Sequence, residues 1–252
     1  MSEQIIFSFV LVLARVSAFI AFFPLFSRRQ LPVKIKIGLA VALSIFWFGS
    51  IPDSAIPLRV EIIWAIILIG KEVLIGALLS MLVGFILIPA RIAGSYIGQE
   101  IGVSMEPITN SGSENATVVT SLFETFAILI FFGLNLHHFM ILMLHYSLNE
   151  FAGKIDLLNL PTDGLVGMVD NLSKYGLLIM APLGVISFAI VVSLFFLTKA
   201  APTLNLFSVG MPLRVGLGLL AMLIFLPVLW KSIEGYFSRM MIELEEFMAF
   251  FV

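Results

Sequence analysis

Four charged side chains interrupt stretches of sequence that are otherwise apolar, and they are the first candidates for chemistry. Arg15, Lys71, Glu72 and Glu124 each lie inside a long apolar segment. A charge at the centre of a membrane-spanning helix costs about 2.5–3.5 kcal/mol on insertion scales, so such residues face protein or water. Buried ion pairs, such as Arg15 with Glu72 or Lys71 with Glu124, would lower that cost. We favour these pairs over a proton relay.

Three histidines, His137, His138 and His145, raise the question of a metal site. Positions 138 and 145 share a helix face two turns apart. No third ligand follows at metal-binding spacing, and the sequence has neither an HExxH motif nor a paired-carboxylate signature. Phosphate-binding glycine loops and serine nucleophile elbows are also missing from it. We therefore expect no metal, no cofactor and no catalysis, with the histidines as polar residues of a helix.

The composition indicates that water is not the main solvent of this chain. Hydrophobic residues make up 60% of its 252 residues, charged residues only 12%, and mean hydropathy is +1.12. A soluble domain has about 25% charged residues. The net charge of −2 gives no basic field for nucleic acid, and the lack of cysteine excludes disulfides and thiolate sites. The first residues, MSEQ, lack the positive region of a secretory signal, so we expect the N-terminus to be retained.

Six apolar segments predict an all-α, membrane-associated protein. No strand pattern competes with the helical periodicity. Two segments are too short and two too long for one bilayer-spanning helix of about 20 residues. Connector charges slightly favour an outward N-terminus, with Arg91 and Arg214 counted in inner connectors. The segments are Ile5–Phe26, Ile37–Ile51, Ile62–Ile88, Val118–Leu148, Tyr175–Leu197 and Val215–Trp230.

Small residues recur every four positions along two successive helices. Such ridges let helix backbones approach closely, either within this chain or against another subunit. The ridges are Gly76, Ser80 and Gly84, followed by Ala90, Gly94, Gly98 and Gly102.

From Lys231 onward the sequence predicts an amphipathic helix with an acidic polar face. An acidic face suits anionic lipid headgroups poorly, so docking on protein is the better interpretation. Its apolar stripe is Ile233, Phe237, Met241, Leu244, Met248 and Phe251.

The stretch GQEIGVSMEPITNSGSEN, residues 98–115, is a polar interruption in this apolar chain. Pro107 lacks an amide hydrogen and biases Glu106 away from the helix, so the preceding helix should end there. Irregular backbone among membrane helices is tolerated only where protein surrounds it or where it lines a water-filled space. The stretch therefore suits an aqueous passage, although the residues alone slightly favour a simple solvent-exposed turn.

The chain resembles the flagellar biosynthetic protein R family, whose injectisome counterpart is called the T component. Three stretches carry the resemblance, which covers essentially the whole chain: GQEIGVSMEPITNSG at 98–112, NLHHF at 135–139 and KAAPTLNLFSVGMPLRVGLGLL at 199–220. The last is the most specific, and its signature residues are Ala201, Pro202, Leu204, Asn205, Phe207, Gly210 and Pro212.

This resemblance implies a non-enzymatic pore subunit of the bacterial type III protein export gate. Residues 1–175 would be P-like and residues 176–252 a Q-like hairpin, completing a helical spiral around a pore for unfolded proteins. Its implied partners are the P and Q subunits, the B-type switch protein and the A-type export protein. Its implied place is the inner membrane at the base of the flagellar basal body, partly raised toward the periplasm, where neighbouring subunits rather than lipid surround its helices.

By the same resemblance, residues 103–115 correspond to a loop that plugs the resting pore. Met105, Pro107 and Ile108 are its implied apolar contacts, and Gly112 is a flexible point. Two departures from the family pattern are Glu106, where Asp is common, and Leu136, where Gly is common. The plug candidates are Val103, Ser104, Met105, Glu106, Pro107, Ile108, Thr109, Asn110, Ser111 and Gly112.

A different class of function remains open on the residues alone. A secondary transporter could use Arg15, Lys71, Glu72 and Glu124 at a solute site. Such transporters often have internal repeats and paired broken helices. The sequence shows neither feature. An intramembrane enzyme ranks last, because catalytic motifs are missing.

Overall fold

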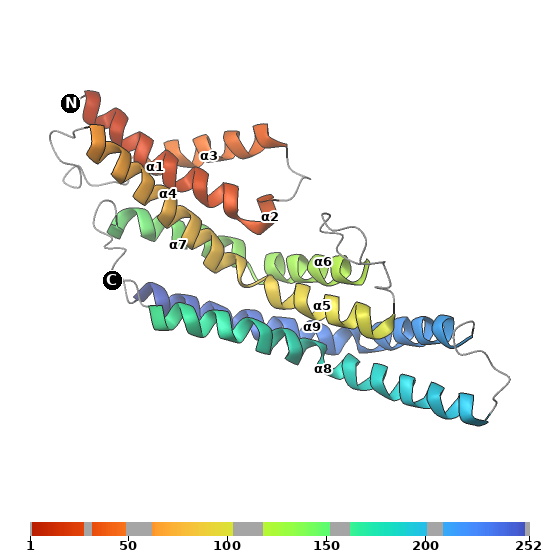
Figure 1. The fold of residues 1–252 in the computed structure, drawn as a ribbon. Coiled ribbons are helices and arrows are strands. Elements are labelled where there is room, and N and C mark those ends of the chain that lie inside the picture. Colours follow the sequence, from red (N-terminus) through yellow and green to blue (C-terminus); the bar gives the residue numbers. More distant parts are fainter. Residues whose placement is uncertain are drawn as a thin grey trace. The chain divides into compact units, whose positions relative to one another are not determined.

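The computed structural model describes residues 2–27, 32–48, 62–102, 118–151, 162–200 and 209–249. Their secondary structure is helical, with no strand among the described residues (Figure 1). This confirms the all-α class predicted from the apolar segments. The plug candidates at 103–112 lie outside the described residues. So do five signature residues, Ala201, Pro202, Leu204, Asn205 and Phe207.

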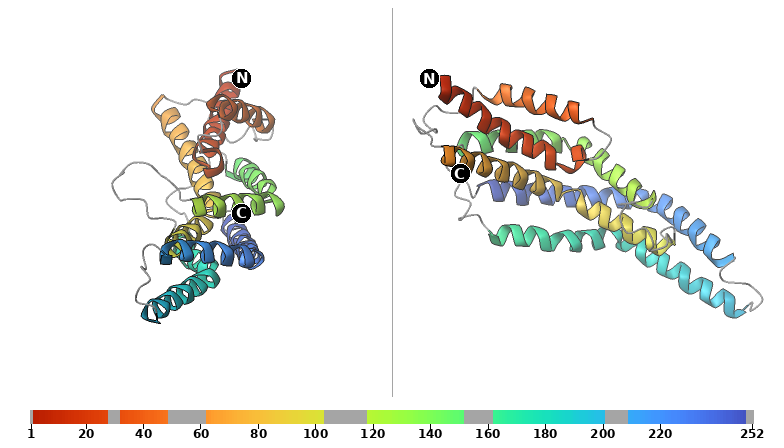
Figure 2. Two further views of the ribbon diagram at one scale, coloured as in Figure 1. Left: turned by 90° about the vertical axis from the view of Figure 1, so that its right-hand side faces the viewer. Right: turned by 45° about the horizontal axis from the view of Figure 1, so that its top comes forward.

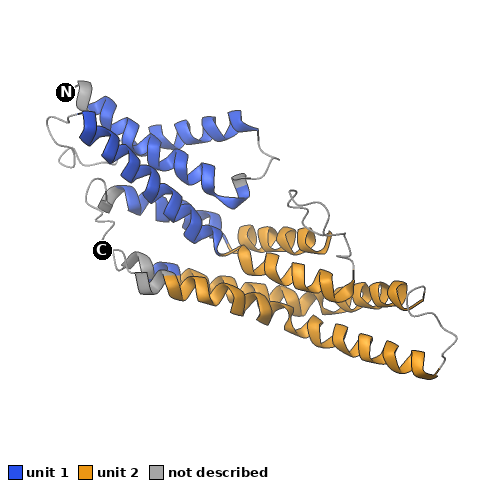
Figure 3. Ribbon diagram, in the orientation of Figure 1, with its two compact units in different colours: residues 1–85, 135–162, 244–252 blue, residues 86–134, 163–243 orange. Residues whose placement is uncertain are grey.

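The chain divides into two compact units, each assembled from segments distant in the sequence (Figure 3). Unit 1 comprises residues 1–85, 135–162 and 244–252, and unit 2 comprises residues 86–134 and 163–243. Neither unit is therefore a continuous stretch of chain. Contacts between helices that are distant in the sequence must hold each unit together.

Unit 1 is built around helix α1. It contains α1 (Ser2–Phe22), the short α2 (Pro24–Ser27), α3 (Val33–Phe48), α4 (Ile62–Gly84) and α7 (Leu136–Phe151). Helix α1 packs along both α3 and α4, and the three lie together in both views of Figure 2. Its core side chains include Val16 and Phe19 of α1 and Leu82 of α4, all fully buried.

Unit 2 combines two shorter helices with two long ones. It contains α5 (Ile88–Ile101), α6 (Val118–Gly133), and most of α8 (Thr162–Ala200) and α9 (Met211–Ala249). Helix α5 packs along α6, and the rings of Tyr175 on α8 and Tyr236 on α9 lie 4.8 Å apart. Because α8 is continuous from Thr162, the boundary expected at residue 175 lies inside a helix.

Close backbone approaches between helices occur at three of the small residues. A Cβ added at Gly76 would run into the main-chain oxygen of Arg15 on α1, and one at Gly84 would lie 2.8 Å from Pro24 Cγ. At Gly94 it would lie 2.9 Å from Phe123 Cβ on α6. All three approaches are made within the chain, which was the first of the two interpretations of the ridges. Ser80 and Gly98 are also buried.

Gly102 has a different role from the packing expected of it. It ends α5 in the left-handed conformation, with φ of 85°, and its N–H donates to the carbonyls of Gly98 and Gln99. This is a glycine C-cap, which satisfies carbonyls that the end of a helix would leave unpaired.

Two apolar segments that the sequence analysis treated as continuous are divided. The third ends at Gly84, and after a turn at residues 85–87 the chain continues as α5, which carries Pro89 in its first turn. The fourth breaks between α6 and α7, where Asn135 adopts φ of 57°. Asparagine is among the few non-glycine residues that tolerate this conformation. The bend therefore forms although Leu136 stands where the family often has glycine.

Four helices within the described ranges are long and apolar enough to cross a membrane: α1, α4, α8 and α9. A fifth candidate arises if α6 and α7 count as one broken span. Helix α3 is too short to be one. The helices are thus unequal in length, as the apolar segments of the sequence were.

The amphipathic C-terminal stretch is the end of α9 rather than a separate helix. Ile233, Phe237 and Leu244 are buried, as the apolar stripe predicted. The residue on that stripe between them is Met240, fully buried, and not Met241, which is half-buried. These positions of the stripe pack against protein within this chain, whereas the side chain of Met248 and the whole of Phe251 lie outside the described residues.

Gly76 offers a direct test of the α1–α4 contact. Replacing a helical glycine with alanine normally stabilises a helix by about 0.5–1 kcal/mol. We expect Gly76→Ala to destabilise by about 1–3 kcal/mol instead, because the added methyl meets main chain that cannot rotate away. The thermal unfolding midpoint of the purified protein in detergent measures this effect.

The matched control is Gly70→Ala on the same helix, where an added Cβ meets nothing within 4 Å. It should leave the midpoint unchanged or raise it. Equal effects of the two substitutions would contradict the close approach at Gly76.

Candidate functional site

A buried guanidinium joins three helices of unit 1. Arg15 of α1 is fully buried, and its Nε donates to Glu72 Oε2 of α4 at 2.5 Å. Its Nη1 donates to the main-chain oxygen of Ser147 on α7 and lies 3.4 Å from Ser147 Oγ. Arg15 and Glu72 are thus paired as the sequence suggested. The main-chain acceptor on α7 could not be predicted from the sequence, because no side-chain pattern indicates which carbonyl will accept a hydrogen bond.

This cluster is suited to holding helices rather than to chemistry. A buried ion pair is stable only when its geometry is good and its remaining protons find acceptors. Here the carboxylate neutralises the guanidinium, and a carbonyl takes a further N–H. Nη2 of Arg15 has no hydrogen-bond partner among the described residues. The pair and the carbonyl together hold α1, α4 and α7 at one point.

Glu124 has a partner that the sequence analysis did not suggest. Its Oε1 accepts from Nε of Arg91 on α5 at 2.5 Å. Arg91 is 54% exposed while Glu124 is nearly buried. Lys71 is half-buried on α4. Arg91 and Arg214 were assigned to connectors, but both lie inside helices, as do other charges of that count on both sides.

The histidines serve the break between α6 and α7 and the packing of α7. The N–H of His138 donates to the carbonyl of Asn135 at 2.9 Å, which starts α7 directly after the break. The rings of His137 and His138 lie 4.1 Å apart, and His145 stacks on Trp47 of α3. Among the described residues no group of three or more His, Asp or Glu is placed to hold a metal ion.

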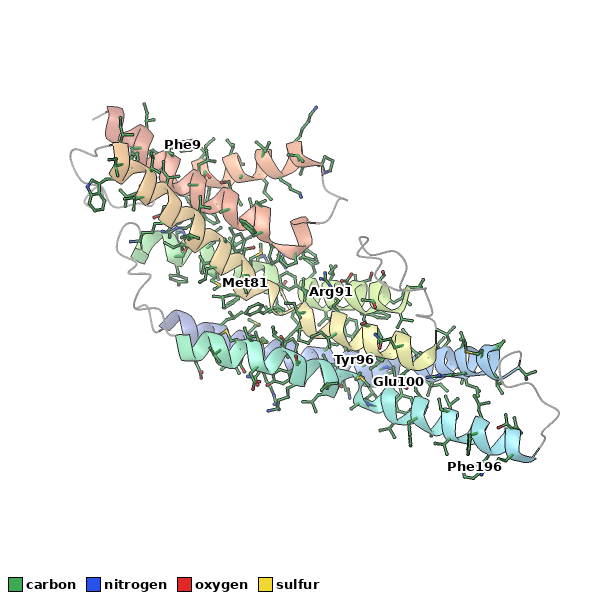
Figure 4. All side chains as sticks on the ribbon, viewed as in Figure 1. Phe9, Met81, Arg91, Tyr96, Glu100 and Phe196 are labelled. Atoms are coloured by element: carbon green, nitrogen blue, oxygen red, sulfur yellow. The ribbon has the colours of Figure 1, made fainter. Side chains whose placement is uncertain are left out.

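The end of α5 is a polar junction that sequence reasoning missed. Nε of Arg214, in the first turn of α9, donates to the main-chain oxygen of Glu100 at 2.7 Å. Its Nη2 lies 3.7 Å from Glu100 Oε2. Figure 4 shows Glu100 at the end of α5 beside α9. The sequence did offer a clue. Proline suits the first turn of a helix, so Pro212 of the signature could have placed Arg214, two residues later, at the start of a helix.

Large apolar side chains remain exposed on most of the long helices. Phe46 on α3 is 76% exposed, Phe188 on α8 68% and Leu223 on α9 75%. Phe196 projects from the far end of α8 in Figure 4. Soluble monomers rarely expose so much apolar surface, so lipid or other protein chains must cover it. Arg15, Glu72 and Glu124 are thus paired within the chain, while these large apolar side chains face outward.

Removing one charge of the Arg15–Glu72 pair should destabilise the protein strongly. We expect Arg15→Leu and Glu72→Leu each to cost about 3–5 kcal/mol, because each leaves an uncompensated buried charge. The double variant should be much less destabilised than the sum of the two, since neither charge remains. Chemical unfolding of the four proteins in detergent closes this double-mutant cycle. Simply additive losses would show that the pair is not coupled.

Comparison with known proteins assigns the chain to a family. A family model described as bacterial export proteins, family 1, matches residues 6–240. The chain is 28% identical to the flagellar biosynthetic protein FliR of Escherichia coli (strain K12) over 229 residues, covering 90% of this chain and 87% of that protein.

Two further relatives agree over nearly the whole length. Identity to FliR of Bacillus subtilis (strain 168) is 25% over 237 residues, covering 92% of this chain and 90% of the relative. Identity to Yop proteins translocation protein T of Yersinia pestis is 21% over 228 residues, covering 88% and 87%. Because the family model matches most of its length, the chain belongs to the bacterial export proteins, family 1.

Proposed function

We propose that this chain is a structural pore subunit of a bacterial type III protein export gate in the inner membrane. It would work with P and Q subunits, the B-type switch protein and the A-type export protein to pass unfolded proteins. The observation that carries the proposal is the family match over residues 6–240, with relatives named for flagellar biosynthesis and for protein translocation. A flagellar rather than an injectisome role is favoured by the FliR relatives.

The distribution of charge and apolar surface supports a structural role. Arg15, Glu72 and Glu124 are each neutralised by a partner in the same chain. These pairs lower the cost of burying the three charges among apolar helices. What does need cover is the exposed apolar surface of α3, α8 and α9. Neighbouring P and Q subunits would supply that cover, with lipid around the assembly.

The same observations disfavour a secondary transporter. Its solute site would require Arg15, Glu72 and Glu124 to exchange partners with a ligand. Arg15 and Glu72 are instead buried against each other, and Glu124 is engaged by Arg91. Separating Arg15 from Glu72 would leave each buried charge without its counter-ion, which is strongly unfavourable.

Within the gate, we assign the P-like part to residues 1–175 and the Q-like hairpin to residues 176–252. The loop at 103–115 would plug the resting pore. Support comes from its composition, because Thr109 to Gly112 offers little side chain to bury, and segments that open are drawn from the less stable parts of a protein.

Deleting residues 108–114 tests the plug. The assembled gate should survive the deletion, and ion leakage through it should rise several-fold, because the pore loses its obstruction. Leakage is measured in cells that carry the gate, with copurification of P and Q as the check on assembly. Deletion of residues 52–58, an equal length from another connector, is the control and should not leak. A tight gate after the 108–114 deletion would reject the plug.

Copurification separates the gate subunit from the transporter. We expect the chain to purify with P and Q subunits when they are coexpressed, and to be less stable in detergent alone than in that complex, because its apolar helices lack cover by themselves. A stable monomer that binds a small solute would contradict the proposal.

A further inference from the structure

Helix α3 buries a single face against the rest of unit 1. It runs back along α1, and the rings of Phe9 on α1 and Phe48 at the end of α3 lie 5.8 Å apart. The buried side chains of α3 are Ala40, Ser44 and Trp47, which follow one another at spacings of four and three residues. Side chains at these spacings share one face of a helix. The faces of α3 directed away from α1 are exposed in the described structure.

The exposed side of α3 is cationic at its start and apolar beyond it. Lys34 is exposed and Lys36 is half-buried. Further along the helix Ile37, Val41 and Ile45 are all exposed, and we call these three residues the outer stripe of α3. Spacings of three, four and four residues place Lys34 and the outer stripe along one face. A positive charge therefore stands at one end of a continuous apolar surface.

No described residue neutralises either of these lysines. Neither makes an ion pair with another residue of the described ranges. Glu72 on α4 is already engaged by Arg15, and the sequence has no acidic residue between Glu3 and Asp53. The start of α3 is thus a local excess of positive charge in a chain whose net charge is −2. It is suited to an anion.

The length of the outer stripe matches the depth of one lipid leaflet. Positions 34 and 45 are 11 residues apart, which is about 16 Å at about 1.5 Å per residue. The hydrocarbon core of a bilayer is about 30 Å thick, so one leaflet contributes about 15 Å of it. Helix α3 is too short to cross both leaflets, but it can reach from the headgroups of one leaflet to the bilayer centre. Lysine side chains beside apolar surface extend toward the headgroups.

We propose that the start of α3 binds an acidic phospholipid, with the phosphate at Lys34 and Lys36 and an acyl chain along the outer stripe. Such a lipid joins an anion to a long apolar chain, and α3 presents two cations and an apolar stripe in the same order. Cations at the end of a membrane helix attract anionic lipids. A zwitterionic phospholipid would cover the stripe equally well but would gain less at the lysines.

This inference does not depend on the proposed export function. That function leaves the cover of α3 to neighbouring subunits and to the lipid around them. The positive charge at the start of α3 favours lipid there, because a leaflet that contains acidic phospholipid offers both the negative charge and the apolar chain.

A reporter on the outer stripe measures contact with lipid acyl chains. The chain has no cysteine of its own, so Val41→Cys gives one defined site for a bimane fluorophore. The labelled full chain is reconstituted in phosphatidylcholine vesicles with a minor fraction of phosphatidylglycerol. Bromine atoms, which quench bimane on contact, are carried on the acyl chains of one lipid or the other. At an equal fraction of brominated lipid, we expect brominated phosphatidylglycerol to quench several-fold more strongly.

Variants of the two lysines test the source of this preference. Lys34→Gln together with Lys36→Gln should abolish it, because both positive charges are lost. Lys34→Arg together with Lys36→Arg keeps both charges and should retain it. Lys174→Gln, which removes an exposed lysine of α8, is the matched control and should leave the preference unchanged. Raising the salt concentration should weaken the preference, since salt screens exposed charges.

Four results would overturn the inference. Equal quenching by the two brominated lipids in the native lysine background would show that the site does not select negative charge. A preference that survives the loss of both lysines would place the selecting charge elsewhere. The absence of quenching by either lipid would show that protein covers the outer stripe. A preference abolished by inorganic phosphate at constant ionic strength would assign the lysines to a free anion instead of a lipid.

Discussion

The neutralisation of one buried cation constrains the whole of unit 1. Arg15 is fully enclosed, and an enclosed guanidinium is strongly unfavourable unless a carboxylate neutralises it and acceptors take N–H groups, as they do here for Nε and Nη1. Its acceptors come from α4 and α7, at sequence distances of 57 and 132 residues. No hairpin of neighbouring helices can supply both. Unit 1 therefore reaches a low energy only when segments from three parts of the chain have come together.

Charge pairing and close packing occur side by side in both units. Gly76 follows Glu72 by about one helical turn and brings the α4 backbone against that of Arg15. Gly94 follows Arg91 by a similar interval and meets α6 within one turn of Glu124. A missing side chain lets the backbones approach, and the short separation lets the charged groups meet. The same combination of a close glycine contact and a neighbouring ion pair therefore occurs once in each unit.

The sequence predicted those features that depend on side-chain type repeated at helical spacing. Apolar runs predicted the helices, the charge types allowed Arg15 and Glu72 to be paired, and the glycines marked close approaches. It did not predict contacts to main chain, such as that of Arg15 with Ser147, because a carbonyl is present at every residue. Arg91 was misplaced because the polar residues after Ile88 resembled a connector. The plug and most of the signature lie outside the described residues, so those assignments stay predictions.

The left-handed Asn135 has a consequence for where hydrocarbon can surround this protein. A helix that stops and restarts leaves main-chain groups that its own hydrogen-bond ladder no longer covers. Acyl chains offer no hydrogen bonds in exchange, so this point must be covered by protein, border a water-filled space or lie at the headgroup level. The hydrocarbon core of a bilayer therefore cannot by itself surround the chain at the level of Asn135. Any placement of the protein in a membrane has to keep the break at Asn135 out of direct contact with acyl chains.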